Sequence, residues 1–359
     1  MTARVLIAGG GTGGHLFPAL AVAEALRERG AEILFVGTKA GMEAKIAPQR
    51  GFALEFIPVT GFRRKRILAN LSFPFQVITS FIQSLRIIRR FQPQAALGTG
   101  GYVCGPVLLA AFICGVPMIL QEQNSYPGVT TRLLARFARR VFLNFAEAAR
   151  HLPPRSHWQH VGNPVRSGFA LLEKKEAMQR WNLNPELPTL LVFGGSQGAM
   201  SLNRATAQAL PDLGQFCNLI WGRGARDTSE VAGWTGPGRL VVKSFIDDMP
   251  AAYAASDLAI CRSGAMTLSE LQAAALPAIL VPFPYAAANH QKHNALAYAK
   301  SGGALVIEDR EWDGQRLLTV VKDLLGNRER LGQMREALAK QPEQDAARVI
   351  AEEALRFAV

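Results

Sequence analysis

The chain has 359 residues, of which 49% are hydrophobic and 19% charged, and its formal net charge at pH 7 is +12. A chain of this length is too long to fold around a single hydrophobic core, so two domains are expected. The composition excludes a low-complexity chain. The four cysteines are scattered without a C-x-x-C pair, which favours a reducing compartment and argues against a zinc site.

The first segment, RVLIAGGGTGGHLFPALAVAEALRERG, predicts a strand, a glycine-rich turn and a helix. Gly9, Gly11 and Gly14 fit the G-x-G-x-x-G pattern usually associated with NAD. NAD enzymes carry an acid at the end of the second strand, whereas EILFVG is followed here by Thr38 and Lys39. We therefore expect backbone N–H groups that bind another anion at a helix N-terminus, with a tight turn that binds nothing as the alternative.

The positive charge is concentrated in residues 1–163, which contain 19 Lys and Arg, seven Glu and no Asp. No acid lies between Glu55 and Glu122. Segment 63–91 joins the basic cluster Arg63–Arg66 to an apolar stripe at helical spacing, which suits an interfacial helix on an anionic membrane surface. A helix packed into the core is the alternative. The stripe consists of Phe75, Ile78, Phe81, Ile82, Leu85 and Ile88, with Arg86, Arg89 and Arg90 nearby.

The longest apolar run, from Pro106 to Leu120, is interrupted by Gly115 and Pro117. It predicts a buried helix, a turn and a strand rather than a membrane span. Further strands are expected in ALEFIPV, PMILQEQ and RRVFLNF. The basic residues lack interleaved stacking aromatics and a known nucleic-acid module, so no nucleic acid is expected as a partner.

The second half repeats this organisation. PTLLVFGGSQGAMSLNRATAQAL predicts strand, glycine loop and helix, and NLIWG, LVVKSFI, LAICRSG and PAILVPF follow as strands between helical stretches. The alternation predicts the α/β class, with two Rossmann-like, doubly wound domains facing each other across a cleft. We place the domains at 1–163 and 164–341, followed by a C-terminal helix, 342–359, that could return to the N-terminal domain.

Seven segments carry a family resemblance over nearly the whole chain. In order, GGGTGGHLFPALAVAEAL, GTGGYVCGPVLLAA, QEQNSYPG, VGNPVR, FGGSQGAMSLN, FIDDMPAAYAASDLAICRSGAMTLSEL and ALPAILVPFPYAAANHQKHNA resemble the MurG glycosyltransferases. The resemblance implies a GT-B fold and inverting transfer of N-acetylglucosamine (GlcNAc) from UDP-GlcNAc. The implied acceptor is the 4-hydroxyl of N-acetylmuramic acid in lipid I (undecaprenyl-pyrophosphoryl-MurNAc-pentapeptide), and the product is lipid II. It also implies a peripheral protein on the cytoplasmic face of the inner membrane, without a cofactor.

The resemblance assigns the two glycine loops of the first half to the acceptor pyrophosphate. His15 and Glu122 are the candidate catalytic bases; His15 is preferred, with orientation of the pyrophosphate as its alternative role. Two positions depart from the family pattern, since Gln121 stands where His is expected and Cys104 where Ser is common. The acceptor-pyrophosphate set is Gly11, Gly13, Gly14, Gly101, Tyr102 and Gly105.

In CRSGAMTLSE a strand is expected to end at Cys261 and a helix to begin near Ala265. Its first N–H groups can face a diphosphate, and Glu270 can bind the ribose diol, with a Thr267–Glu270 capping box as the alternative. The donor set, part of it implied by the resemblance alone, is Thr12, Gly13, Gly14, Asn124, Arg166, Ser196, Ile246, Ala265, Met266, Thr267, Glu270, His290 and Gln291.

Asp247 and Asp248 are interpreted as the start of a loop rather than metal ligands, because no second carboxylate or His lies at ligand spacing. No metal is therefore assigned. A 2-epimerase or glycolipid synthase of similar architecture, an NAD oxidoreductase and a non-catalytic membrane binder remain the rival functions.

Overall fold

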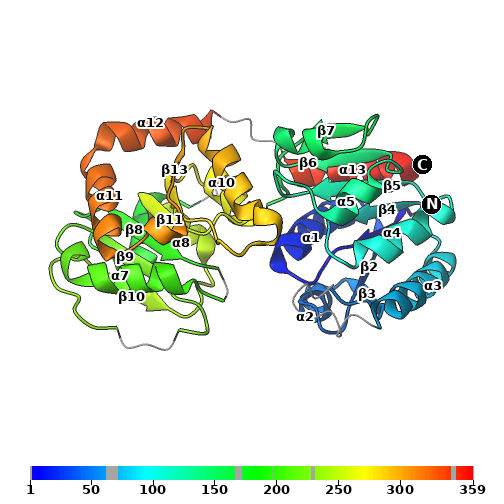
Figure 1. Cartoon of the computed structure of the whole chain (residues 1–359), viewed down its shortest axis with the longest axis horizontal. Helices are drawn as coiled ribbons and strands as arrows, with labels where there is room; N and C mark the ends of the chain where they lie inside the picture. The colour runs from blue at the N-terminus through cyan, green and yellow to red at the C-terminus, as the bar shows by residue number, and fades with distance from the viewer. Residues whose placement is uncertain are drawn as a thin grey trace. The chain divides into compact units, whose positions relative to one another are not determined.

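The structure is a computed structural model in which the chain divides into two compact units (Figure 1). Unit 1 comprises Met1–Arg166 with Gln344–Val359, and unit 2 comprises Ser167–Glu343. The described residues are 2–61, 72–165, 172–195, 197–227, 231–340 and 345–358.

Unit 1 is built on seven parallel strands in the order β3-β2-β1-β4-β5-β6-β7. The strands are β1 (Arg4–Ala8), β2 (Glu32–Gly37), β3 (Ala53–Phe56), β4 (Ala95–Gly98), β5 (Met118–Glu122), β6 (Arg140–Leu143) and β7 (Trp158–His160). The helices are α1 (Gly13–Glu28), α2 (Glu43–Gln49), α3 (Phe73–Phe91), α4 (Cys104–Ile113), α5 (Val129–Leu134) and α13 (Ala346–Ala358).

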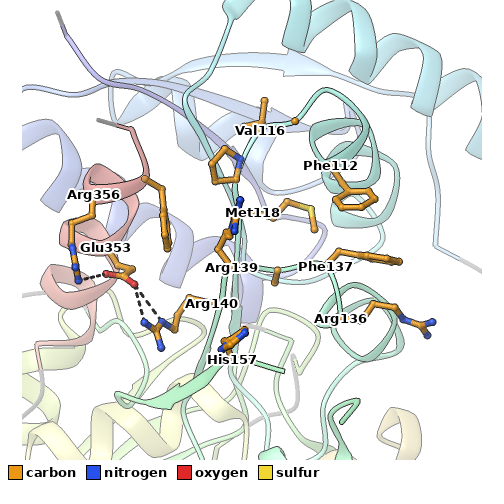
Figure 2. A pocket seen from close by; sticks show the side chains of 14 residues that line it. Phe112, Val116, Met118, Arg136, Phe137, Arg139, Arg140, His157, Glu353 and Arg356 are labelled. Carbon is orange, nitrogen blue, oxygen red and sulfur yellow. Dashed lines mark hydrogen bonds and ion pairs between the residues drawn. The ribbon is translucent and has the colours of Figure 1, made fainter. Parts of the chain in front are cut away.

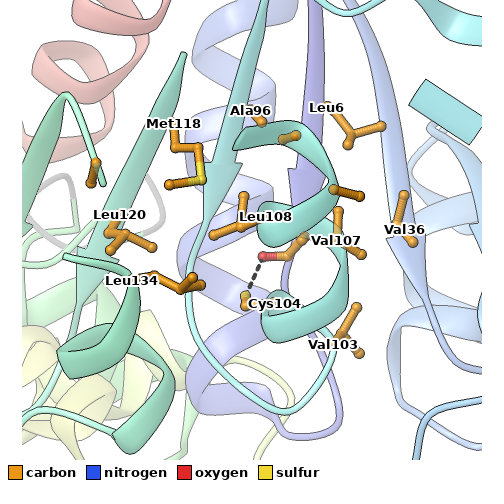
Figure 3. Close-up of a cluster of buried hydrophobic side chains, with 14 of the residues drawn as sticks. Leu6, Val36, Ala96, Val103, Cys104, Val107, Leu108, Met118, Leu120 and Leu134 are labelled. Carbon is orange, nitrogen blue, oxygen red and sulfur yellow. Dashed lines mark hydrogen bonds between the residues drawn. The ribbon is translucent and has the colours of Figure 1, made fainter. Parts of the chain in front are cut away.

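Strand β1 supplies both faces of this core because successive side chains of a strand point to opposite sides. Val5 and Ile7 pack with α1 and α13, whereas Leu6 and Ala8 pack with α3 and α4. Figure 3 shows the second cluster, in which side chains of α4 meet those of β1, β4 and β5. The strand order reverses between β1 and β4, so the loops that follow these two strands lie at the switch point where such sheets bind ligands.

Unit 2 has six parallel strands in the order β10-β9-β8-β11-β12-β13, with its switch point between β8 and β11. The strands are β8 (Thr189–Phe193), β9 (Asn218–Gly222), β10 (Leu240–Lys243), β11 (Leu258–Cys261), β12 (Ala278–Leu280) and β13 (Ala304–Val306). The helices are α6 (Lys174–Arg180), α7 (Met200–Leu213), α8 (Met249–Ala255), α9 (Ala265–Ala273), α10 (His290–Ala299), α11 (Gly314–Gly326) and α12 (Arg328–Ala339).

The prediction of two doubly wound α/β sheets is confirmed, and the run from Pro106 to Leu120 is a helix, turn and strand as expected. Helix α1 begins at Gly13, earlier than the pattern suggested, with Pro18 in its second turn. The C-terminal helix α13, red in Figure 1, packs on α1 and lies in unit 1. Within the described residues, none of the helices combines the length and apolar character that a membrane span requires.

Candidate active site

The first glycine loop, residues 9–14, connects β1 to α1. Thr12 is the extended N-cap of α1 and offers no side-chain cap. The N–H groups of Gly13 and Gly14 have no hydrogen-bond partner among the described residues, and Gly14 is exposed. Free N–H groups at a helix N-terminus are an anion site, so this loop has the donors that a phosphate needs.

The second glycine loop, residues 99–103, connects β4 to α4 and packs against the first loop. A Cβ at Gly11 would come within 2.9 Å of the Tyr102 ring, and a Cβ at Gly101 within 2.8 Å of the Gly10 carbonyl oxygen. The Thr99 hydroxyl donates to the carbonyl of His15 at 2.8 Å. The structure thus brings the predicted acceptor residues of both loops together, with Gly105 in the first turn of α4.

His15 lies in the first turn of α1 and its ring faces the second loop. Its Nδ1 lies 3.0 Å from the carbonyl oxygen of Thr99 and 3.0 Å from Oε1 of Gln123. Because Gln123 Nε2 donates to the same Thr99 oxygen, Gln123 Oε1 is an acceptor, and His15 Nδ1 must be the donor. In the neutral ring, Nε2 is then the nitrogen that can accept a proton.

Gln123 belongs to a chain of buried amides. Its Nε2 donates to Oε1 of Gln121, and Nε2 of Gln121 donates to Oδ1 of Asn163 at 2.9 Å. All three side chains are buried. The Gln121 that departs from the family pattern therefore has a definite place, two hydrogen bonds from His15.

Glu122, the other candidate base, is 3% exposed at the end of β5. Its Oε1 accepts from the N–H and the side-chain amide of Asn124, both at 3.1 Å, and its Oε2 accepts from Gly128 N–H at 3.0 Å. A carboxylate engaged in this way organises the loop after β5 and orients Asn124.

Cys104, the second departure, begins α4 beneath the second loop. Its thiol donates to the carbonyl of Ala8 at 2.9 Å (Figure 3). It also donates to the carbonyl of Gly100 at 3.0 Å, and its sulfur accepts from Gly100 N–H at 3.2 Å. Burial raises the pKa of this thiol to about 12, so it is protonated at neutral pH. A serine hydroxyl could make the same hydrogen bonds, so the cysteine preserves them. They join the second loop to Ala8, the last residue of β1, from which the first loop begins.

In unit 2, β11 ends at Cys261 and α9 begins at Ala265, as predicted. The N-cap is Gly264 and no side chain caps the helix, so the alternative of a Thr267–Glu270 capping box is wrong. The Tyr253 hydroxyl instead donates to Oε2 of Glu270 at 3.0 Å. Burial and the neighbouring Glu270 raise the pKa of Tyr253 well above its usual value, so the phenol remains a donor that fixes this carboxylate.

The glycine loop after β8 packs against the loop after β9. A Cβ at Gly198 would lie 2.1 Å from the carbonyl oxygen of Arg223, and a Cβ at Gly224 would lie 2.1 Å from Gly198 N. Glycine is therefore required on both sides of this contact. Ser196 within the loop and Arg166 before unit 2 lie outside the described residues.

Gln291 and Ile246 also border the C-terminal edge of this sheet. Oε1 of Gln291 accepts from Phe283 N–H at 2.9 Å, and its carbonyl accepts from Ser263 Oγ at 2.8 Å, which ties α10 to the loop before α9. The Ile246 side chain is buried next to Gly222, the last residue of β9. His290, at the first position of α10, is half-buried, and its Nδ1 lies 2.8 Å from the carbonyl oxygen of Ala287.

Asp248 is the N-cap of α8 and accepts from Ala251 N–H at 3.1 Å, so it ends the loop after β10 rather than starting it, and its interpretation as the start of a loop is wrong. Among the described residues, no group of three or more His, Cys, Asp or Glu side chains is arranged to hold a metal ion.

Sequence reasoning missed two residues that hold the loops. Arg262 donates to the carbonyls of Val281 and Pro282 at 2.9 and 3.2 Å and pairs with Asp309 at 2.6 Å, which braces the loop after β11. Glu43, at the start of α2, accepts from Gly11 N–H at 2.8 Å. The sequence does show an acid shortly after the end of β2, but it does not show in which direction the Glu43 side chain points.

Helices α3, α4 and α5 cover one face of unit 1 and pack side by side. Phe75 is 73% exposed, Ile78 57% and Ile82 44%. Ile88 is buried, and Phe81 and Leu85 pack on the core, so the prediction of one six-residue stripe is wrong for these three residues. Arg63–Arg66 lie outside the described residues. We define the apolar–basic face as Phe75, Ile78, Ile82, Leu109, Phe112, Ile113, Val129, Leu133 and Phe137 with Arg86, Arg89, Arg136 and Arg139, all exposed.

A cavity of about 740 Å³ adjoins this face at the N-terminal ends of β5 and β6, opposite the glycine loops (Figure 2). Phe112 and Phe137, whose rings lie 4.6 Å apart, belong to both. The one carboxylate of the cavity, Glu353, is held by Arg140 at 3.2 Å and Arg356 at 3.0 Å. With Arg136 and Arg139 also lining it, the cavity is cationic.

Comparison with known proteins covers both units. The N-terminal domain of glycosyltransferase family 28 matches residues 5–143 and the C-terminal domain of that family matches residues 189–350. The chain is 44% identical over 355 residues, 97% of each chain, to the UDP-N-acetylglucosamine--N-acetylmuramyl-(pentapeptide) pyrophosphoryl-undecaprenol N-acetylglucosamine transferase of Chlorobium luteolum. It is 42% identical over 348 residues, 94% of each chain, to the Moorella thermoacetica protein of that name. It also resembles the solved structure of Acinetobacter baumannii MurG, with 28% identity, a TM-score of 0.78 and coverage of 99% of each chain.

Proposed function

Because the chain belongs to glycosyltransferase family 28 and to its MurG group, we infer that it transfers N-acetylglucosamine from UDP-GlcNAc to lipid I. The fold is GT-B, and the product is lipid II, a precursor of peptidoglycan. The new bond forms at the 4-hydroxyl of N-acetylmuramic acid with inversion at the anomeric carbon, and UDP leaves.

The observation that carries this function is the meeting of the two glycine loops and His15 at the switch point of the unit 1 sheet. The N–H groups of Gly13 and Gly14 suit an anion, and lipid I carries a pyrophosphate directly next to the sugar that is glycosylated. Binding the pyrophosphate here places the accepting sugar within reach of the adjacent imidazole. The acceptor therefore belongs to unit 1.

We assign the base to His15. Inverting transfer requires a group that removes the proton of the attacking hydroxyl, and Nε2 of His15 is an acceptor because Nδ1 donates to Thr99 and Gln123. Glu122 has both oxygens engaged by Asn124 and Gly128, so its role is to position Asn124. Asn124, Thr12 and the N–H groups that follow Thr12 also serve the donor sugar.

UDP-GlcNAc is assigned to unit 2. The first N–H groups of α9, at Ala265, Met266 and Thr267, face the diphosphate, and Glu270, oriented by Tyr253, binds the ribose diol. The remaining donor residues follow from the resemblance: backbone of Ile246 for uracil, His290 and Gln291 for the GlcNAc hydroxyls, Ser196 for phosphate and Arg166 for the charge of the leaving UDP.

The apolar–basic face is the surface that meets the membrane in which lipid I resides. Exposed aromatic and aliphatic side chains surrounded by arginines suit the interface of an anionic bilayer, and the cationic cavity extends this charge to the edge of unit 1. The four unpaired cysteines accord with the reducing, cytoplasmic side of the membrane. The protein is thus a peripheral enzyme of that surface.

The test is GlcNAc transfer from UDP-GlcNAc to a lipid I analogue in detergent with EDTA present. Wild type should form the lipid II analogue, and His15→Ala should lose about 10² in kcat or more while still binding UDP, because general base catalysis contributes this much. Full activity of His15→Ala would remove His15 as the base. Release of UDP, or epimerised donor, without any lipid product would transfer the assignment to an epimerase or hydrolase.

A further inference from the structure

We propose that Glu43 is a positioning residue of the reaction: its buried carboxylate locks the first glycine loop in the form that binds the acceptor pyrophosphate. The inference rests on the proposed acceptor role of that loop and adds a residue that touches no substrate.

The carboxylate of Glu43 lies against the first glycine loop and accepts a hydrogen bond from one of its backbone N–H groups. Glu43 is fully buried, and its Oε2 accepts from Gly11 N–H at 2.8 Å. Its Oε1 accepts from the N–H of Thr38 at 2.9 Å and from the Thr38 hydroxyl at 3.0 Å. Among the described residues no Lys, Arg or His pairs with it, and a buried charge without a counter-ion is costly unless such hydrogen bonds hold it.

Three glycines make room for this carboxylate. A Cβ at Gly10 would lie 2.4 Å from Glu43 Cδ, one at Gly37 2.3 Å from its Cγ, and one at Gly41 2.2 Å from its Oε1. These glycines come from the loop after β1, the end of β2 and the turn before α2. Three separate segments therefore shape one cradle around a single side chain.

The hydrogen bond to Gly11 fixes the peptide plane between Gly10 and Gly11. With this N–H directed at Glu43, the carbonyl of Gly10 is directed towards the second loop, where a Cβ at Gly101 would lie 2.8 Å from it. A peptide between two glycines rotates easily, because neither residue has a Cβ to restrict it. Loss of the carboxylate would let this peptide turn and separate the two loops.

The same carboxylate reaches the second loop through Thr38. The Thr38 hydroxyl donates to Glu43, so its oxygen is an acceptor for the Tyr102 hydroxyl 3.5 Å away. Glu43 is thus the common partner of the first loop and, through Thr38, of the second.

Glu43→Gln is the first variant, since it keeps the shape but replaces an acceptor oxygen by an NH2 group that opposes a backbone N–H. The KM for the lipid I analogue should rise at least tenfold, and the Kd of UDP, measured by calorimetry, should stay within twofold. Ile33→Val, a core change at the opposite end of β2 from the loop, controls for general destabilisation and should leave the acceptor KM unchanged.

Thr38→Val and Thr38→Ser form a matched pair that keeps Glu43. Val removes the hydroxyl donor and should raise the acceptor KM severalfold, whereas Ser should restore it. Amide hydrogen exchange gives a readout that needs no substrate: Gly11 should exchange at least tenfold faster in Glu43→Gln than in wild type.

An unchanged acceptor KM in Glu43→Gln, or unchanged exchange at Gly11, would overturn the proposal. Equal rises in acceptor KM and UDP Kd would also overturn it, because they indicate general loosening. If wild type makes no lipid product, the proposed function fails, and exchange at Gly11 alone then decides whether Glu43 locks the loop.

Discussion

The Nδ1 atom of His15 lies 3.0 Å from Oε1 of Gln123, and this contact, together with the one to the Thr99 carbonyl, makes Nδ1 the donor and leaves Nε2 as the acceptor nitrogen of the neutral ring. Gln123 is itself fixed, because its amide donates to Gln121 and to the Thr99 carbonyl. A neutral amide orients the ring without placing a negative charge beside it. The chain of buried amides therefore orients the His15 ring, and each amide in it has only one assignment of donor and acceptor that satisfies its neighbours.

Removing this orienting amide should impair catalysis more than binding. In Gln123→Met the side chain keeps its length, but Nδ1 loses one of its two acceptors and the His15 ring is held by the Thr99 carbonyl alone, so the ring is less firmly oriented. We expect kcat to fall by about 10², the lower range for loss of a general base, with the UDP Kd unchanged. Gln121→Met, one hydrogen bond further away, should have a smaller effect. Steady-state kinetics check both variants. A larger loss of kcat in Gln121→Met than in Gln123→Met would contradict the orientation of His15 by this chain of amides.

Only one of the four cysteines should react readily with a thiol reagent. Cys114 is exposed, whereas Cys104, Cys217 and Cys261 are buried. Burial also raises the pKa of Cys104 and Cys217 to about 12, so little thiolate exists at pH 8. Titration with Ellman's reagent should give about one fast thiol in the native protein and four in denaturant. Cys114→Ser should abolish the fast phase, and fast modification that persists in this variant would refute the assignment.

These raised pKa values also predict loss of stability in alkali. The protonated thiols stabilise the folded state fully below their ordinary pKa of 9.0, and this contribution is lost as pH rises from there towards about 12. The urea midpoint should therefore fall over this range, and Cys217→Ala should show a shallower fall. Cys114→Ser, at an exposed position, is the control and should leave the slope unchanged.

The sequence predicts the strands and glycine loops well because both depend on local pattern: apolar runs closed by glycine. It also places the candidate base His15 directly after a glycine loop. It does not reveal the partners of His15, since Gln123 lies 108 positions away and the chain to Asn163 exists only once β5 is in place. The role of Glu43 is hidden for the same reason, because only folding shows that its carboxylate points inward.

The helix α3 shows the limit of periodicity in another way. Helical spacing identified its apolar positions, but such spacing cannot say which of them face the core. Ile82 is exposed although it directly follows Phe81, which packs on the core, and Ile88 is buried. The apolar residues thus divide between a packed side and an exposed side of the helix, and only the fold separates them.

Charge reversal on the apolar–basic face should weaken membrane binding. Arg86 is exposed on α3, and each basic residue near an anionic surface contributes about 1 kcal/mol. Arg86→Glu should lower the partition coefficient on vesicles containing phosphatidylglycerol by roughly tenfold, and the difference should shrink with added salt. The control is Arg316→Glu, an equal reversal on the exposed side of α11 in unit 2, which should bind as wild type does. Equal losses in both variants would indicate attraction through net charge alone.

The contact between Tyr253 and Glu270 provides a graded test of the donor site. The phenol donates to Glu270 Oε2 at 3.0 Å and is held protonated, because burial and Glu270 raise the pKa of Tyr253. Tyr253→Phe leaves the carboxylate in place but less restrained, so the KM for UDP-GlcNAc should rise about three- to tenfold, which corresponds to one ordinary hydrogen bond of about 1 kcal/mol. Glu270→Gln weakens the ribose contact itself and should cost more, whereas the KM for the lipid acceptor should stay unchanged in both. Because the two residues act on one contact, Tyr253→Phe should add little when it is introduced into the Glu270→Gln variant. Additive effects would show that Tyr253 acts on the donor independently of Glu270.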